Sequence, residues 1–102
     1  MHVDDIAMSY QQAGRNYKAK AMVAIVDANS APVEGATVYG IFSGATNDIE
    51  SGVTAADGQV TLTSSNKKDG GTWQFCVDDV VKSGWTYDPA ANVQTCATIT
   101  AP

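Results

Sequence analysis

Apolar and polar residues alternate with a period of two along most of the 102-residue chain. Side chains of an extended strand point alternately to its two faces, so this alternation predicts strands with one face buried. The segment over residues 17–27 begins half-exposed and ends apolar on both faces. The pattern predicts about seven short strands, over residues 2–9, 17–27, 36–43, 48–54, 59–64, 72–78 and 93–100.

The first of these segments allows two interpretations. A helical stripe, with Asp4 as a cap and Gly14 as a stop, is formed by Val3, Ile6, Ala7, Tyr10 and Ala13. One face of a strand is formed instead by His2, Asp4, Ile6 and Met8. Because nothing helical follows in the chain, we favour a first strand near residues 2–9.

Turn-forming residues punctuate the predicted strands. Residues 29–32 (NSAP) and the pair Asp57-Gly58 are typical of tight turns, and residues 66–71 (NKKDGG) are expected to form an exposed loop. Gly40, in the middle of a strand, predicts a β-bulge or the close approach of a bulky neighbour such as a Trp. Short strands with turn signals every ~8–12 residues are typical of an immunoglobulin-like (Ig-like) fold, so we predict an all-β, antiparallel Ig-like sandwich.

The two cysteines occupy equivalent positions in the last two strands. Cys76 and Cys96 each fall on the polar face of their strand, opposite the apolar set. Neighbouring antiparallel strands bring such positions within disulfide reach, so we predict a cross-strand surface bridge. An antibody domain instead carries its disulfide through the core between the sheets. Closing a loop of this size would contribute ~3 kcal/mol.

Composition and charge limit the classes of protein that the chain can belong to. With 44% hydrophobic and 17% charged residues, it is expected to be one globular domain over residues 1–102. The net charge of −5, without a basic cluster, argues against nucleic-acid binding and against an anionic membrane surface. No apolar run approaches the ~20 residues of a membrane span, and we expect a monomer.

The first residues of the chain, MHVDDIAMS, carry acids where a signal peptide would carry basic residues. A disulfide in an acidic, lysine-poor domain nevertheless suggests an exported protein. We therefore expect an extracellular or cell-surface domain that was excised from a larger chain, with other domains of that parent as its partners.

Two runs in the first two thirds of the chain carry a resemblance to a known family. They are VAIVDANSAPVEGATVYGIFSG and SGVTAADGQVTLTS, and the matching residues are Asp27, Asn29, Pro32, Val33, Gly35, Ala36, Val38, Thr54, Asp57, Gly58, Val60 and Leu62. The chain resembles the bacterial Ig-like accessory domains of the invasin and carboxypeptidase-regulatory-like type, found in secreted bacterial proteins such as proteases and other hydrolases. Ser30 stands where these domains usually have Gly, which leaves Asn29 to supply any left-handed conformation. The resemblance implies a non-catalytic module and supplies no catalytic residues.

Candidate catalytic and metal-binding residues are few. His2 is the only histidine, and we expect it at a solvent-exposed terminus rather than in a triad or zinc site. The acidic pairs could offer oxygen ligands to calcium, but adjacent strand residues point to opposite faces, so we expect solvated carboxylates at Asp4, Asp5, Asp78 and Asp79. We expect no metal, no cofactor and no enzymatic activity.

The aromatic loop SGWTYDP contains the most interesting side chains. Trp85 and Tyr87 would form a flat platform for sugar rings if they project to the same side, and Tyr39 would extend it. Hydrogen bonds to sugar hydroxyls would come from Asp88, Asn92 and Gln94. Alternatively, Trp85 plugs the end of the core and Tyr87 bonds a backbone carbonyl. Trp73 is assigned to the core.

Two functions therefore follow from the sequence. The first is a non-catalytic structural or interaction module that acts as a spacer, a stabiliser or a targeting domain. The second is a carbohydrate-binding module that uses the aromatic loop to hold cell-surface or polymeric carbohydrate. Exposure of Trp85 favours the second function, and its burial favours the first.

Overall fold

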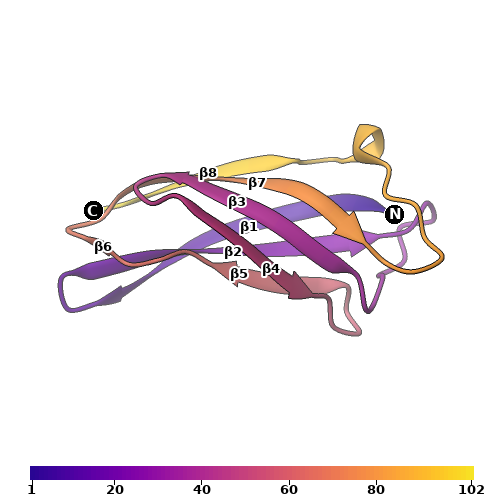
Figure 1. Cartoon of the computed structure of the whole chain (residues 1–102), viewed down its shortest axis with the longest axis horizontal. Coiled ribbons are helices and arrows are strands. Elements are labelled where there is room, and N and C mark those ends of the chain that lie inside the picture. The colour runs from indigo at the N-terminus through magenta and orange to yellow at the C-terminus, as the bar shows by residue number, and fades with distance from the viewer.

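The computed structural model describes all residues, 1–102, and contains two antiparallel β-sheets (Figure 1). One sheet has the order β1-β2-β5, with the short strand β6 also paired to β2. The other has the order β4-β3-β7-β8. The elements are β1 (His2–Ala13), β2 (Asn16–Val26), β3 (Thr37–Gly44), β4 (Asp48–Val53), β5 (Gln59–Thr63), β6 (Lys67–Lys68), β7 (Gly71–Val81), the 3-10 turn η1 (Pro89–Ala91) and β8 (Cys96–Ala101).

The predicted fold class, an all-β Ig-like sandwich with one cross-strand disulfide, is confirmed. The strand count is eight rather than seven, because Lys67 and Lys68 of the predicted loop pair with β2. The ambiguous first segment is a strand, and it is longer than expected. The last strand begins at Cys96, so residues 93–95 of the predicted strand lie in the preceding loop instead.

The core fills the space between the two sheets with the apolar faces that the alternation predicted. Its largest fully buried side chains are Trp73, Phe42 and Phe75. The rings of Phe42 and Phe75 lie 4.9 Å apart between centroids. The indole N–H of Trp73 donates to Thr46 Oγ1 at 2.9 Å, so the largest buried side chain also has its polar atom satisfied.

Gly40 combines the two features predicted for it. The β3–β7 register shifts between Tyr39 and Gly40, where Asp78 is the extra residue of a β-bulge. A Cβ built on Gly40 would lie 2.3 Å from Cε1 and Cζ of Phe75, so only glycine leaves room for that ring. The approaching ring is a Phe rather than the Trp suggested as an example.

Two β-bulges change the direction of the acidic pairs. Val3-Asp4-Asp5-Ile6 in β1 and Val77-Asp78-Asp79-Val80 in β7 each have a register shift at the aspartates. In both segments the outer two residues are buried and both aspartates are exposed. The expectation that adjacent aspartates point to opposite faces was wrong, because the extra residue of a bulge interrupts the alternation.

The turn after β2 also differs from its prediction. Ser30, not Asn29, has the left-handed backbone, with φ at 65°. Asp27 holds the turn, because its Oδ1 accepts from the backbone N–H groups of Asn29 at 2.8 Å and of Ala31 at 2.9 Å. These hydrogen bonds lower the pKa of Asp27 below its ordinary value of 3.8, since they favour the charged carboxylate.

Thr54, at the end of β4, joins three segments of the sandwich although its side chain is polar. The residue is 3% exposed. Its hydroxyl donates to the carbonyl of Val33 at 2.6 Å and accepts from the N–H of Ala36 at 3.0 Å. This single hydroxyl therefore ties the end of β4 to the segment that leads into β3.

Asp48 fastens the start of β4 to the segment that connects β5 and β6. Its carboxylate accepts from Thr46 Oγ1 at 2.6 Å, from the backbone N–H of Ser65 at 3.1 Å and from the Ser65 hydroxyl. Partial burial alone would raise the pKa of Asp48, but these hydrogen bonds outweigh it and lower the pKa below 3.8.

The predicted disulfide is confirmed. Cys76 and Cys96 are directly opposite each other in β7 and β8, with a Cα–Cα distance of 4.1 Å and an S–S bond. Both strands belong to one sheet, so the bridge lies across that sheet and does not cross the core. The neighbouring residues Val77 and Thr95 form a hydrogen-bonded pair, through Val77 N and Thr95 O. The two cysteines therefore form a non-hydrogen-bonded pair, the position at which the Cα atoms of antiparallel strands are closest.

Candidate functional site

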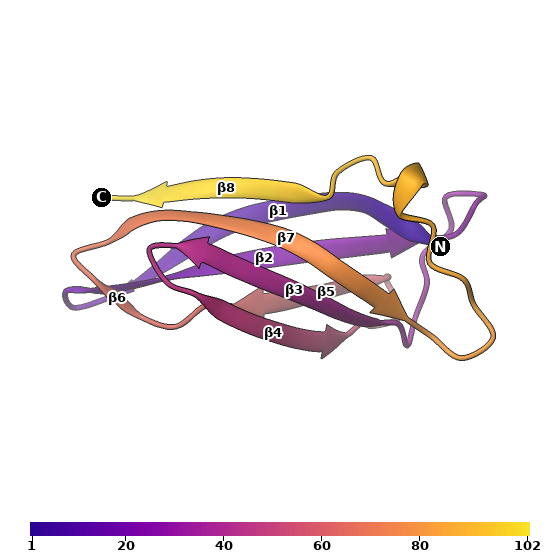
Figure 2. The same ribbon diagram turned by 45° about the horizontal axis from the view of Figure 1, so that its top comes forward.

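The candidate site lies in the loop between β7 and β8, at the end of the sandwich where the chain begins (Figure 2). β7 continues to Val81, but its pairing with β8 extends no further than Cys76. The intervening loop arcs away from the end of β7 and returns through η1. The space between this end of β7 and the arc is an open groove of about 600 Å³.

Hydrogen bonds to β1 hold the loop in place. The terminal amine of Met1 donates to Thr86 O at 2.9 Å, and the N–H of Asp88 donates to Met1 O at 2.9 Å. Two loop side chains accept from the strand backbone: Asn92 Oδ1 from Val3 N at 2.7 Å and Gln94 Oε1 from Ile6 N at 3.2 Å. The two amides expected to bind sugar hydroxyls therefore use their oxygens to fasten the loop.

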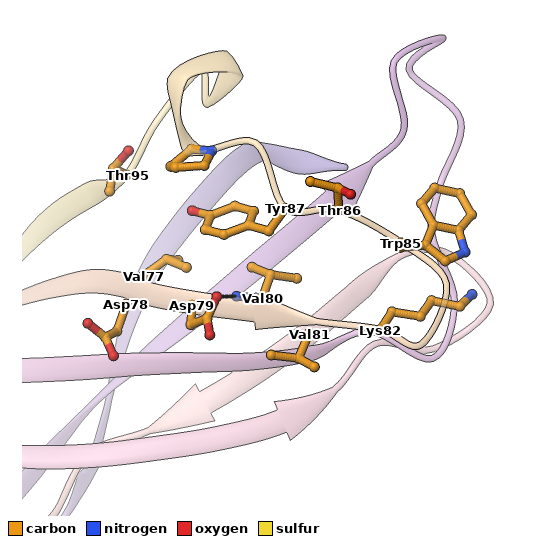
Figure 3. Close-up of a pocket in the computed structure, with 11 residues that line it drawn as sticks. Val77, Asp78, Asp79, Val80, Val81, Lys82, Trp85, Thr86, Tyr87 and Thr95 are labelled. Carbon is orange, nitrogen blue, oxygen red and sulfur yellow. Dashed lines mark hydrogen bonds between the residues drawn. The ribbon is translucent and has the colours of Figure 1, made fainter.

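The lining of the groove combines aromatic, hydroxyl and charged side chains (Figure 3). Trp85 is 43% exposed, so it does not plug the core. Tyr87 packs partly against the core, and its hydroxyl accepts from Asn92 Nδ2 at 2.7 Å rather than donating to a backbone carbonyl. The lining residues are Val77, Asp78, Asp79, Val80, Val81, Lys82, Trp85, Thr86, Tyr87, Pro89 and Thr95.

The two aromatic rings do not form one flat platform. Figure 3 shows Trp85 beside Lys82 at one end of the groove, whereas the Tyr87 ring lies over the middle of it with its hydroxyl toward Thr95. The ammonium of Lys82 lies over the Trp85 ring, 5.2 Å from its centroid, in a cation–π contact. One face of the indole is thus covered, and the opposite face remains for a ligand.

Two residues that the sequence grouped with the platform lie outside the groove. Tyr39 lies on the outer face of β3, directly opposite Asp79, and is 39% exposed. Asp88 is exposed at the start of η1. The structure therefore brings Trp85 and Tyr87 to the groove but not Tyr39 or Asp88.

Several residues that line the groove were not predicted from the sequence to belong to the aromatic site. Lys82, Thr86 and Thr95 face the groove, and the aspartates of β7 border it. In Figure 3 these carboxylates lie on the opposite side of the β7 ribbon from the aromatic rings. The sequence did contain a sign of these two carboxylates. In Val77-Asp78-Asp79-Val80 two polar residues stand together where the strand pattern requires polar and apolar residues to alternate.

No group of three or more His, Cys, Asp or Glu side chains lies close enough to hold a metal ion. His2 is not at a free terminus as expected, because it is the first residue of β1, pairs with Val26 and is half-buried. No helix has the length and apolar character needed to cross a membrane.

No protein-family model, curated protein or solved structure matches the chain. The resemblance to bacterial Ig-like accessory domains therefore stays a prediction.

Proposed function

We propose that the chain is a non-catalytic structural and interaction module of a larger exported protein. The observation that carries this proposal is the position of the two termini, which lie at opposite ends of the long axis (Figures 1 and 2). The domain measures 43 × 23 × 19 Å. Neighbouring domains attached before Met1 and after Pro102 would be separated by the full length of the sandwich.

Both ends of the domain are anchored, as a spacer requires. Met1 is bonded to the loop before β8, and Ala101, next to the last residue, is 3% exposed. The disulfide is consistent with an oxidising compartment, where such bonds persist. These features support a rigid module outside the cytoplasm.

The spacer function is tested by attaching donor and acceptor fluorescent proteins to the two termini. Time-resolved energy transfer is expected to report one narrow distance that persists until the domain unfolds. The matched control replaces the domain by a flexible Gly/Ser linker of 102 residues, whose end-to-end distance is broadly distributed. A distribution as broad for the domain as for the linker would contradict the proposal.

A second candidate function, carbohydrate binding, is favoured by the exposure of Trp85 in the groove. Its free face would stack on the apolar face of one sugar ring. The hydroxyls of Thr86 and Thr95 border the same groove and would bond sugar hydroxyls. Because Lys82 covers the other indole face and Tyr87 is not coplanar with Trp85, one ring rather than an extended run of sugar residues would be stacked.

Tryptophan fluorescence tests this second function directly. Trp73 is fully buried, so iodide quenching of the wild-type chain would report Trp85 alone. A soluble polysaccharide that binds the groove would protect Trp85 from iodide, and Trp85→Ala would abolish binding. Tyr39→Ala is the matched control, because this exposed aromatic lies outside the groove. If no polysaccharide in a broad panel protects Trp85, carbohydrate binding is excluded for this panel and the spacer function stands alone.

A further inference from the structure

The two sides of the sandwich differ in how their strand edges are covered. On the side of β1, the loop before β8 supplies Asn92, Val93 and Gln94 to the free backbone groups of the strand. On the other side, β4 is the last strand of its sheet and pairs only with β3 (Figure 2). An uncovered edge strand is a template for pairing with another strand.

The backbone groups left free on β4 can be assigned from the register. Thr54 N donates to Ala36 O at 2.9 Å, and hydrogen-bonded pairs alternate along an antiparallel ladder. Residues 48, 50 and 52 therefore bond to β3, and Ile49, Ser51 and Val53 direct their N–H and C=O groups away from the sheet. No hydrogen bond from elsewhere in the chain reaches these three residues.

Two of these three residues, Ile49 and Val53, expose apolar side chains. Ile49 is 79% exposed and Val53 is 60% exposed, which makes them two of the most exposed apolar side chains of the domain. Ile41 lies directly opposite Ile49 in β3, on the same outer face of the sheet. The edge has no lysine or proline, and its two charged residues, Asp48 and Glu50, occupy the positions that alternate with this exposed apolar face.

We propose that two copies of the chain pair through their β4 strands, antiparallel about a twofold axis at Ser51. The four-stranded sheet of each copy would continue into that of the other. In this register each Ile49 is opposite Val53 of the second copy and the two Ser51 side chains face each other. The three free N–H groups and three free C=O groups of each strand all find partners.

The charges on β4 disfavour the registers whose axis lies before Ser51. An axis at Glu50 would place the two Glu50 carboxylates opposite each other, and an axis at Ile49 would place Asp48 opposite Glu50. Like charges directly opposite each other are destabilising. With the axis at Ser51, Glu50 is opposite Gly52, so the strand pairs with itself without a direct repulsion. This proposal differs from the monomer expected from the sequence.

Ser51→Pro tests the pairing without disturbing the fold. Its N–H points away from β3, and proline is accepted in edge strands where the N–H faces solvent. Sedimentation velocity at concentrations up to on the order of 1 mM, where weak interfaces associate, is expected to show a wild-type dimer. Ser51→Pro should weaken association at least about tenfold while the thermal unfolding midpoint is unchanged. Ser51→Thr, which keeps the N–H, is the matched control and should associate as the wild type does.

Cysteine cross-linking tests the register and does not depend on the proline variant. Two thiols introduced by Ser51→Cys would face each other at ~5.5 Å between Cα atoms, within disulfide range. Two thiols introduced by Ile49→Cys would be four residues out of register, roughly 13 Å apart along the strands. We expect a covalent dimer only from Ser51→Cys. A wild-type chain that is monomeric at every concentration, undiminished association of a folded Ser51→Pro variant, or equal cross-linking at both positions would overturn the proposal.

Discussion

The contact between Gly40 and the Phe75 ring makes a quantitative prediction about the core. Alanine at position 40 would place a Cβ 2.3 Å from two ring carbons and 3.2 Å from Leu62 Cδ1. Carbon atoms in contact prefer about 3.5–4.0 Å, so the ring would have to move by more than about 1 Å. Phe75 is fully buried and packs against Phe42, which leaves it no space to enter.

Overpacking of this kind costs typically about 1–3 kcal/mol. Because two ring atoms are contacted at once, we expect Gly40→Ala to lower the free energy of unfolding by about 3 kcal/mol. In a domain of this size each kcal/mol lowers the melting temperature by about 4–8 °C. Urea denaturation followed by the fluorescence of the buried Trp73 would measure the change. Ser43→Ala, on the outer face of the same strand, is the control and should change stability by less than about 0.5 kcal/mol.

The cause of the destabilisation is tested by shortening the ring. Phe75→Leu creates space next to position 40, so Gly40→Ala should cost at least about 1 kcal/mol less in that background. A cost below about 0.5 kcal/mol in the wild type, or an equal cost in both backgrounds, would refute the argument that the ring excludes a side chain.

Four further predictions concern other parts of the sandwich. Replacing Cys76 and Cys96 together by alanine should cost about 3 kcal/mol, since the bridge closes a loop with a sequence separation of 20; equal urea midpoints for the two proteins would contradict this. Thr54→Val should cost about 1–3 kcal/mol by leaving two buried backbone groups unpaired, whereas Thr54→Ser should cost less. Ser30→Gly should raise stability by roughly 0.5–1 kcal/mol, because glycine accepts the left-handed backbone without strain; a destabilised variant would show that the Ser30 side chain makes a necessary contribution. The pKa of Asp48 in the folded protein lies below 3.8. The ionised carboxylate therefore contributes its full stabilisation of the fold above the unfolded-state pKa, and this stabilisation is lost as the pH falls through the folded-state pKa. The unfolding free energy of the wild type should therefore fall more steeply below pH ~4 than that of Asp48→Asn, and parallel acid titrations of the two would contradict the assignment.

The alternation of residue types was sufficient to predict most of the strands and the disulfide, but not the order of the strands in each sheet. Cys76 and Cys96 lie on the polar faces of two strands that follow each other in the sequence. When two such strands pair antiparallel, side chains on the same face of the sheet lie next to each other, as these two cysteines do. Gly40 was likewise predictable, because a residue without a side chain in an apolar strand face implies that something else fills its place.

The bulges and the site were less accessible from the sequence. Asp78 and Asp79 interrupt the alternation, but only the register with β3 shows that one of them is an extra residue. The position of Trp85 depends on a loop whose course is fixed by contacts of Asn92 and Gln94 with a strand almost the whole chain away. Such long-range contacts leave no periodic signal in the sequence.

The opposite placement of the termini also determines how the domain would respond to force. β1 leads away from the Met1 end and β8 leads toward the Pro102 end, so tension between the termini acts along both strands (Figure 1). Ladder hydrogen bonds are perpendicular to the strands, so such tension loads many of them together in shear rather than opening them one by one. After rupture, the disulfide would still withhold from extension the segment between its cysteines, whose sequence separation is 20, or roughly 70 Å of contour length. A tether built from such domains would resist pulling and, once overstretched, would lengthen by less than its full chain allows.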